Sequence, residues 1–477
     1  MRRRATNRPP LDAASLVTQE EEIEPTPEEP KPAPRVSFFT LGCRLNQHDT
    51  AAMRSDLERG GWRAGEPERA DVLIVNTCTV TRRADQEARQ LVRRLAAARP
   101  GAAIVVTGCY AERAPGEVAG LPGVRAVVGT AERERIAEAL EPWRASAVAR
   151  GATRAAATRA WPDLPSGTRP PIRARRDFAA SAPLSFGRTR ALLKVQDGCD
   201  SFCAYCVVPM VRGRSRSLPL SGALEQARRL LDAGFHELVV TGADLGSYGR
   251  DLGEGSLLPE LVERLLSLGG AHRVRLSSIE PHKLDPALVA MIGVEPRLCR
   301  HLHLPLQSGS DRVLGIMRRG YRASDYRRLV DRIASRGPAA IGADVIVGHP
   351  GEGAAEFRES LRFVEESPIT HLHVFRYSPR PGTAAERLDG FVDSAGPRER
   401  AAAMRALGDR KREAFLRSLV GSTLPGIPEA PRGSSRVPAM TDLYATVRLS
   451  APPPRRGIVP VLVTACEAGE LVGTAAG

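Results

Sequence analysis

Three short apolar runs early in the chain each end in a cysteine, and this pattern constrains the fold more than any other feature. The runs are "VSFFTLGC", "DVLIVNTC" and "AAIVVTGC", and their cysteines, Cys43, Cys78 and Cys109, lie 35 and 31 residues apart. Each interval suits one strand–helix–strand unit. Helix-like segments such as "DQEARQLVRRLAAARPG" lie between the runs. Continuous apolar strands joined by helices are typical of a parallel sheet.

The carboxyl ends of parallel strands meet at one edge of a sheet, where open α/β sheets bind ligands. We therefore expect Cys43, Cys78 and Cys109 to converge at that edge. The alternative is three ordinary buried thiols, because free cysteine packs as a small hydrophobe. Cysteines at the same point of successive repeats favour a shared site.

The chain is strongly basic, and arginine carries nearly all of the positive charge. The formal net charge of the 477 residues is +14, and the only lysines are Lys31, Lys194, Lys283 and Lys411. Planar guanidinium groups on a basic surface suit a polyanion such as RNA. A base composition that favours arginine codons explains the same charge equally well.

The N-terminus, "MRRRATNRPPLDAASLV", has positive charge but lacks the apolar run of a signal peptide. No stretch approaches the 18 apolar residues or so that a membrane span needs. We expect a cytoplasmic protein with no membrane partner. In that reducing compartment, the eight cysteines are metal ligands or catalysts rather than disulfides.

Composition divides the chain into five segments. Residues 1–34 are acidic and proline-rich, which predicts a disordered tail. Residues 35–140 form the predicted parallel α/β sheet domain. Residues 141–185 are rich in Ala, Arg and Pro and indicate a flexible linker, either an RNA-facing arm or merely a solvated connection.

A second series of strands and helices occupies residues 186–416. Six strand-like runs alternate with amphipathic helices there, too few for a closed eight-fold barrel of roughly 250 residues. We predict an open (β/α)6 partial TIM barrel. Residues 417–477 alternate like short strands with turns, which indicates a small β-barrel of a kind that holds nucleic acid. The fold class is therefore α/β with a small C-terminal β-barrel.

The segment "GCDSFCAYCVVP" follows the first strand of this second series and holds Cys199, Cys203 and Cys206. Structural zinc takes four protein ligands, so a zinc site would need a fourth group such as His236. A cubane iron–sulfur cluster also normally takes four cysteines. Held by three, it leaves one iron open to a small molecule, which is a catalytic feature.

The Cys-x3-Cys-x2-Cys spacing after the first strand of a six-fold barrel resembles the radical S-adenosylmethionine (SAM) enzymes. The resemblance implies a 4Fe-4S cluster whose open iron is chelated by SAM, and reductive cleavage of SAM to a 5′-deoxyadenosyl radical. Further motifs stand in the order seen in methylthiotransferases: "TLGCRLNQHDT", "VNTCTVT", "TGCYAER", "LSSIEP", "LHLPLQSGSD" and "DVIVGHPGE". This resemblance spans about residues 36–390, and the terminal module resembles the TRAM domain of that family.

Membership of that family would give the first three cysteines a role as well. The resemblance implies that Cys43, Cys78 and Cys109 hold a second 4Fe-4S cluster, also with an open iron. One SAM molecule would then give its methyl group to sulfur at this cluster, and a second would supply the radical. An electron donor and a sulfur source would be needed as partners. The sequence identifies no catalytic residue beyond the six cysteines, and Cys299 and Cys466 lie outside both trios.

Positions at strand ends match cofactor contacts of the family: Thr241, Gly242, Ser278, Glu280, Ile346 and Gly348. The first two match the place where the SAM amino group is held, and the last two lie near its adenine. His349 stands where the family usually has an aromatic residue. As an alternative, a lone glycine or serine at a strand end is often a turn residue.

The surroundings of Cys43 are most similar to the MtaB type, which acts on N6-threonylcarbamoyladenosine at position 37 of tRNA. The MiaB type, which acts on isopentenyladenosine, usually has tyrosine before Gly-Cys, whereas this chain has Leu41. The RimO type, which acts on a ribosomal-protein aspartate, has Pro-Lys after the cysteine, whereas this chain has Arg44 and Leu45. The implied partner is a tRNA anticodon loop. A non-catalytic iron–sulfur RNA-binding protein is the alternative, and the intact second motif argues against it.

Overall fold

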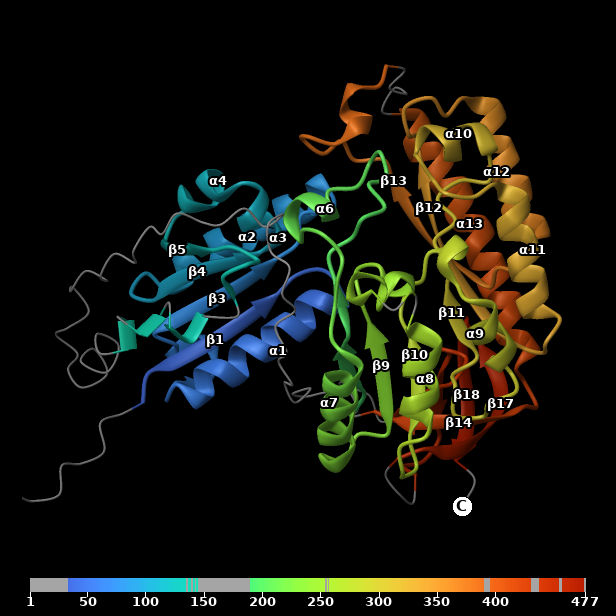
Figure 1. Ribbon diagram of the computed structural model, residues 1–477, viewed down its shortest axis with the longest axis horizontal. Coiled ribbons are helices and arrows are strands. Elements are labelled where there is room, and N and C mark those ends of the chain that lie inside the picture. The colour runs from blue at the N-terminus through green and yellow to red at the C-terminus, as the bar shows by residue number, and fades with distance from the viewer. Residues whose placement is uncertain are drawn as a thin grey trace, which may run out of the picture.

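The computed structural model of the chain describes residues 33–144 and 189–475, except 134–135, 139, 142, 254, 256, 390–394, 430–436 and 454–456. Three parts follow one another: a parallel-sheet domain, an open barrel and a small closed β-barrel (Figure 1). This architecture confirms the fold class expected from the sequence. No helix within the described ranges is long and apolar enough to cross a membrane. Most of the predicted tail, 1–34, and linker, 141–185, lie outside the described residues.

The N-terminal domain is a five-stranded sheet in the order β2-β1-β3-β4-β5, and every pairing is parallel. Its strands are β1 (Arg35–Thr40), β2 (Arg63–Ala64), β3 (Val72–Thr77), β4 (Ala103–Gly108) and β5 (Val124–Val128). Its helices are α1 (Arg44–Arg59), α2 (Arg82–Ala98), α3 (Cys109–Arg113) and α4 (Pro115–Ala119), with a 3-10 turn at Pro67–Arg69. Alternate residues of β3 pack on the two faces: Ile74 lies with Met53 of α1, and Leu73 lies with Val92 of α2.

The central domain has six parallel strands in two hydrogen-bonded halves, β10-β9-β6 and β11-β12-β13. They are β6 (Ala191–Lys194), β9 (Glu237–Thr241), β10 (Arg273–Leu276), β11 (His301–His303), β12 (Ala340–Val347) and β13 (His371–Arg376). Isolated parallel bridges, Val274 to Leu298 and Ser278 to His303, join the halves. No pairing within the described chain joins β6 to β13, so the barrel is open as predicted.

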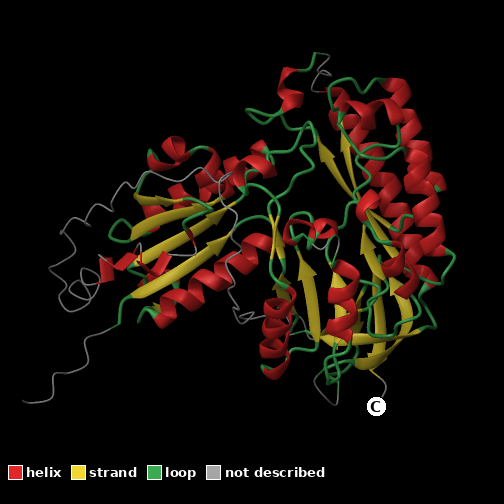
Figure 2. Cartoon of the chain, viewed as in Figure 1, coloured by secondary structure: helices red, strands yellow, loops and turns green. Residues whose placement is uncertain are grey.

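Helices cover the outside of the barrel (Figure 2). They are α7 (Leu220–Asp232), α8 (Leu258–Leu266), α9 (Pro286–Met291), α10 (Asp311–Ile316), α11 (Ala323–Ala334), α12 (Ala354–Glu366) and α13 (Ala395–Ser418). Between β6 and α7 lie a short antiparallel ribbon, β7 (Gln196–Asp197) with β8 (Arg216–Ser217), and the single turn α6 (Val208–Val211). Four 3-10 segments complete this domain: Leu245–Ser247, Arg250–Leu252, Pro281–Lys283 and Ala384–Arg387.

Five strands form the closed C-terminal barrel, in the order β14-β15-β16-β18-β17. They are β14 (Thr423–Pro428), β15 (Val437–Thr441), β16 (Thr446–Leu449), β17 (Val459–Glu467) and β18 (Glu470–Ala475). This barrel lies below the amino ends of β9 to β11 in Figure 1. Arg275 donates to the carbonyls of Thr441 and Asp442 at 2.8 and 3.0 Å, and so ties the two barrels together.

Glu237 neutralises the arginines at this junction. It is fully buried, and its carboxylate accepts from Arg273 Nε at 2.7 Å and from Arg275 Nε at 2.8 Å. Burial alone would raise the pKa of Glu237, but Arg275 and Arg273 bring it down to about 2. The carboxylate therefore stays charged and keeps both guanidinium groups aimed at the C-terminal barrel.

We predict that Glu237→Gln lowers the free energy of unfolding by about 3–5 kcal/mol, because it leaves buried guanidinium groups without a counter-charge. Urea denaturation followed by circular dichroism measures this change. Glu470→Gln is the matched control, since Glu470 forms an exposed pair with Arg448, and it should leave the urea midpoint unchanged. Equal midpoints for both variants would contradict this role of Glu237.

Candidate functional site

The first cysteine trio lies at the carboxyl edge of the N-terminal sheet. Cys43 precedes α1, Cys78 directly follows β3, and Cys109 directly follows β4. Gly42 has a φ of +97°, and a Cβ on it would lie only 3.0 Å from the Cys78 sulfur. Glycine thus lets the loop that carries Cys43 pass against Cys78.

Two of these three thiols are shielded from water. Cys78 and Cys109 are buried, whereas Cys43 is exposed. Burial, followed by the neighbouring Cys109 and Cys43, raises the pKa of Cys78 to about 12. Adjacent buried thiols become thiolates only when cations stand beside them, as a bound metal group would.

A buried ionic network joins this edge to the central barrel. Asp49 of α1 lies 2.9 Å from Lys194 Nζ of β6 and 3.1 Å from Arg212 Nη2. Asp197 of β7 lies 2.8 Å from Lys194 and 2.9 Å from Arg212 Nη1. Arg133 contacts both carboxylates, at 3.1 and 3.0 Å. The network thus connects the two domains with side chains that are almost entirely removed from solvent.

The network holds more positive than negative charge. Its two carboxylates face Lys194, Arg133 and Arg212, and Arg216 lies 3.7 Å from Asp197. Burial opposes the charge on Arg212, but Asp197 and Cys109 raise its pKa well above the usual value. Arg212 also donates to Asn46 Oδ1 at 2.6 Å. Three cysteine thiolates would supply the missing negative charge, so the residues present fit an anionic metal–thiolate group at the first trio.

The second trio lies in the loop between β7 and α6. Gly198 has a φ of +74°, and a Cβ there would lie 1.9 Å from the carbonyl oxygen of Arg214, so only glycine fits. Burial raises the pKa of Cys199 to about 12, with the Asp244 charge adding to the effect. Burial, followed by the neighbouring Cys203, also raises the pKa of Cys206. This loop therefore gathers three partly buried thiols.

Charged side chains stand around the second trio. Arg319 Nη1 lies 3.2 Å from the Cys203 sulfur and pairs with Glu280. Asp244 lies 3.6 Å from the Cys199 sulfur and 2.6 Å from Lys283 Nζ. Cations within reach of the sulfurs fit a thiolate-ligated cluster.

His236 cannot complete a zinc site with these cysteines. It precedes β9, next to Gly457 of the C-terminal barrel. The cysteine loop follows the carboxyl end of β6, and β6 runs parallel to β9. The zinc alternative therefore lacks the fourth ligand that the sequence offered.

The six predicted SAM contacts lie at the carboxyl ends of β9, β10 and β12 or just beyond them. Glu280 pairs with Arg319, whose Nη1 lies 3.2 Å from the Cys203 sulfur. Gly242 lies against Gln196, because a Cβ on it would be 2.7 Å from Gln196 Oε1. Gly348 is packed against Pro397, and His349 is buried, with Tyr205 and Tyr377 edge-on to its ring. Their contact with SAM stays a prediction.

A cavity of about 440 Å³ opens beside Cys203 and is also lined by Ser201, Lys283 and Arg319. None of the six predicted SAM contacts lines it. The cavity is lined partly by residues that follow β9 and β10, such as Ser247 and His282, and it does not coincide with the predicted SAM contacts.

The two trios are neighbours across the domain interface. Cys109 packs in one apolar cluster with Val207 and Val211, which follow Cys206. Thr130 Oγ1 donates to the carbonyl of Val211 at 2.6 Å, and Arg380 pairs with Asp85 at 2.5 Å. These contacts hold the carboxyl edge of the sheet against the cysteine loop of the barrel.

Sequence reasoning identified the cysteines but missed the charged and polar residues around them. These are Asn46, Asp49, Asp85, Arg133, Lys194, Asp197, Arg212, Asp244, Lys283, Arg319 and Arg380. A signal was present for Asn46 and Asp49, which stand three and six residues after Cys43 in "CRLNQHD". Lys194 and Asp197 are charged residues at the end of an otherwise apolar run, a second signal.

Comparison with known proteins assigns both domains. Residues 35–129 match the family described as "Uncharacterized protein family UPF0004", and residues 193–364 match the radical SAM superfamily. The chain is 35% identical over 396 residues to the threonylcarbamoyladenosine tRNA methylthiotransferase MtaB of Bacillus subtilis, covering 83% of this chain and 84% of that protein. The MtaB of Aquifex aeolicus is 36% identical over 395 residues, covering 82% and 92%. The MtaB of Thermotoga maritima is 36% identical over 377 residues, covering 76% and 80%.

Among solved structures, the radical S-adenosylmethionine methyltransferase TsrM from Kitasatospora setae, with cobalamin and a [4Fe-4S] cluster bound, has a similar fold. The TM-score is 0.52 at 14% identity, over 79% of this chain and 91% of that chain. At this level of identity, the likeness concerns the fold alone.

We predict that Asp49→Asn lowers the free energy of unfolding by about 3–5 kcal/mol, because it leaves buried cations short of one counter-charge. Asp56→Asn is the control on the same helix, since Asp56 pairs with the exposed Arg59, and it should change the stability little. Urea denaturation of both variants measures the difference. An Asp49 variant as stable as the wild type would contradict the role given to the network.

Proposed function

The chain belongs to the MtaB group of radical SAM methylthiotransferases, and from that membership we propose its substrate. It adds a methylthio group to C2 of N6-threonylcarbamoyladenosine at position 37 of tRNA. The observation that carries this proposal is the identity of 35–36% to three proteins named for threonylcarbamoyladenosine tRNA methylthiotransfer. The cysteine trios of the radical SAM and UPF0004 regions supply the ligands that such an enzyme needs.

We further propose two 4Fe-4S clusters and the use of two SAM molecules, one as methyl donor and one as radical source. Cys43, Cys78 and Cys109 would hold one cluster, and the other trio, Cys199, Cys203 and Cys206, would hold the second. When bound, three-thiolate cubanes supply an open iron each, for sulfur at the first trio and for SAM at the second. An electron donor and a sulfur source complete the set of partners.

The chain's own residues would create the conditions for this chemistry. The apolar contact of Cys109 with Val207 and Val211 excludes water from the interface between the trios. Arg212 and Arg133 place positive charge beside the first trio, and Arg319 and Lys283 do so beside the second. Thr241, Gly242, Ser278, Glu280, Ile346 and Gly348 stand as the proposed SAM contacts.

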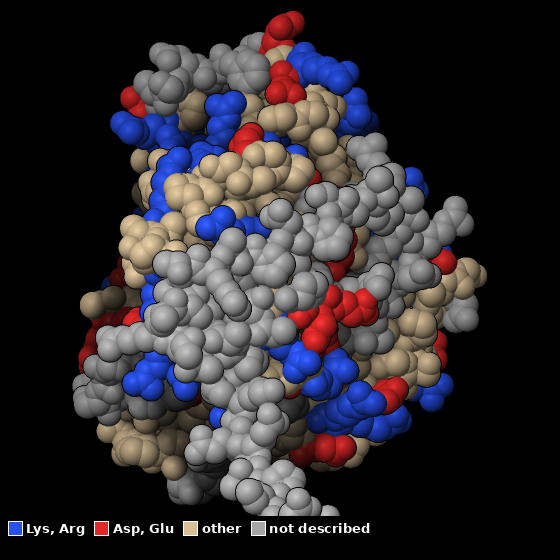
Figure 3. All heavy atoms as spheres, turned by 90° about the vertical axis from the view of Figure 1, so that its left-hand side faces the viewer, with Lys and Arg blue, Asp and Glu red and all other residues tan. Residues whose placement is uncertain are grey.

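A tRNA anticodon loop suits the shape and charge of the molecule. Bases in such a loop are unstacked, so a target adenine can be splayed into a pocket. The net charge of +14 favours a polyanion. On the face seen in Figure 3, basic side chains stand among acidic ones, so charge there is mixed rather than uniformly positive. The small C-terminal barrel is a second candidate RNA contact.

The test is mass spectrometry of tRNA nucleosides from a strain that lacks this gene. We expect the 2-methylthio form of threonylcarbamoyladenosine to disappear, and its unthiolated precursor to accumulate. Complementation with the wild-type gene should restore the product, and complementation with Cys78→Ala or Cys203→Ala should not.

Other outcomes would redirect the proposal. Loss of the 2-methylthio form of isopentenyladenosine would assign the MiaB type. Unchanged tRNA, together with loss of a methylthio group from a ribosomal-protein aspartate, would assign the RimO type. Full restoration by both cysteine variants would contradict the roles given to the trios.

A further inference from the structure

The two faces of the barrel strands differ sharply in character. Leu302, Ile341 and Val345 point into the aliphatic core shared with the helices. The alternate residues of β11, β12 and β13 therefore face the inside of the barrel. These inward residues are His301, His303, Gly342, Asp344, Ile346, His371, His373 and Phe375. The inside of this half of the barrel is thus lined mainly by imidazoles and one carboxylate.

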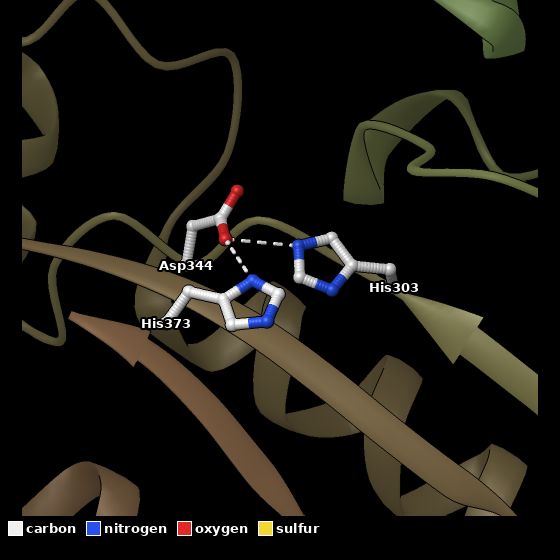
Figure 4. Close-up of side chains that lie close together, drawn as sticks. All are labelled: His303, Asp344 and His373. Atoms are coloured by element: carbon white, nitrogen blue, oxygen red, sulfur yellow. Dashed lines mark hydrogen bonds and ion pairs between the residues drawn. The ribbon is translucent and has the colours of Figure 1, made fainter. Parts of the chain in front are cut away.

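Asp344 holds two of these imidazoles in place (Figure 4). Its Oδ1 lies 3.0 Å from His303 Nε2 and 3.2 Å from His373 Nδ1. Burial opposes ionisation of Asp344, but the hydrogen bonds from His303 and His373 hold its pKa well below the usual value. The exposed fraction of the side chain rises from 8% for His303 to 23% for Asp344 and 57% for His373. A ligand inside the barrel therefore meets His373 and Asp344 first.

Deeper in the barrel, polar atoms lack partners. His301 stacks between His371 and Tyr444, with ring centroids 5.7 and 4.5 Å away. Within the described structure, both ring nitrogens of His301 and Nε2 of His371 are buried without a hydrogen-bond partner. Such atoms are costly to leave unpaired. They indicate that the floor of the barrel is built to receive polar groups.

Positive charge stands at the same depth. Tyr444 reaches in from the turn between β15 and β16, and Arg44 Nη2 donates to its hydroxyl at 2.9 Å. Arg275 also lies over the Tyr444 ring, 5.3 Å from its centroid. Arg44 directly follows Cys43, so this cation connects the first trio to the barrel floor. Asp344 is the only acid among the inward residues of β11 to β13 in the described chain.

The inward face changes toward the open end of the barrel. Phe375 follows His373 on the same face of β13 and is 43% exposed. It pairs in register with Ile346 of β12. An exposed aromatic ring at this level can stack on a purine, while a substituent of that purine extends down toward Asp344.

We propose that His303, Asp344 and His373 bind the threonylcarbamoyl substituent of the target adenine and select it against an isopentenyl substituent. This inference rests on the function proposed above. The hydroxyl and N–H groups of the substituent donate to Asp344 and to the second ring nitrogens of His303 and His373. Its carboxylate accepts from the ring N–H of His301 and from Arg44. An isopentenyl group has no polar atoms, so it would displace water from Asp344, His373 and Arg44 without replacing the lost hydrogen bonds, and its binding would be disfavoured.

The same three side chains offer ligand atoms within 4.8 Å of one another, as a metal site would. The two hydrogen bonds to Asp344 account for that spacing without an ion. Metal analysis of the purified enzyme is therefore part of the test.

The test uses the full-length enzyme, reconstituted with iron and sulfide and assayed without oxygen. Two substrates are compared: tRNA carrying threonylcarbamoyladenosine 37 and tRNA carrying isopentenyladenosine 37. Asp344→Asn and His373→Gln each preserve size and remove one polar interaction. We expect each to raise KM for the first tRNA by about 10- to 100-fold. Turnover at saturation, iron content and the substrate-free cleavage of SAM should stay near wild type. The preference for the first tRNA over the second should shrink by a similar factor.

The control is His236→Gln, which alters a histidine at the opposite end of β9 and should leave KM unchanged. An unchanged KM in both barrel variants would overturn the proposal. The proposal would also be overturned if the wild-type enzyme held one equivalent of a metal other than iron and the His373→Gln variant lacked that metal. A wild-type enzyme that thiolates only the isopentenyl tRNA would instead overturn the proposed function, whatever the variants do.

Discussion

Two buried carboxylates, Asp49 and Asp197, hold the sheet domain against the barrel, and the arrangement of both cysteine trios depends on them. Together they bridge Lys194, Arg133 and Arg212 across the interface. Ions removed from water are stable only when they are closely paired. The excess of cations therefore calls for further negative charge nearby, and Arg212 lies beside Cys43 and Cys109. The stability of the interface and the proposed binding of an anionic cluster thus depend on the same residues.

The sequence predicted those parts of the fold that depend on local residue patterns. Three apolar runs predicted parallel strands, and the cysteine at the end of each run lies at one sheet edge because parallel strands end there. Six further runs predicted the six barrel strands, and the alternation of the last segment predicted the closed C-terminal barrel. The family resemblance from the quoted motifs is confirmed by relatives with 35–36% identity.

The residues that sequence reasoning missed act across long separations. Arg212 and Asn46 stand 166 positions apart, and Arg44 and Tyr444 stand 400 apart, so no local pattern indicates that they touch. The "HLH" repeated in β11 and β13 indicates no site by itself, because its pairing with Asp344 across the sheet depends on register. A one-residue slip would turn all of these side chains to the other face. Register became visible only in the folded chain.

We propose that the two trios form two separate cluster sites on either side of this interface. Iron and sulfide analysis of the anaerobically reconstituted protein, with electron paramagnetic resonance of the reduced state, tests it most directly. Two cubanes predict about eight irons and eight sulfides per chain. Replacing all three cysteines of either trio by alanine should leave about four of each. No more than four irons in the wild type, zinc in place of iron, or loss of all iron when either trio is replaced would contradict the claim.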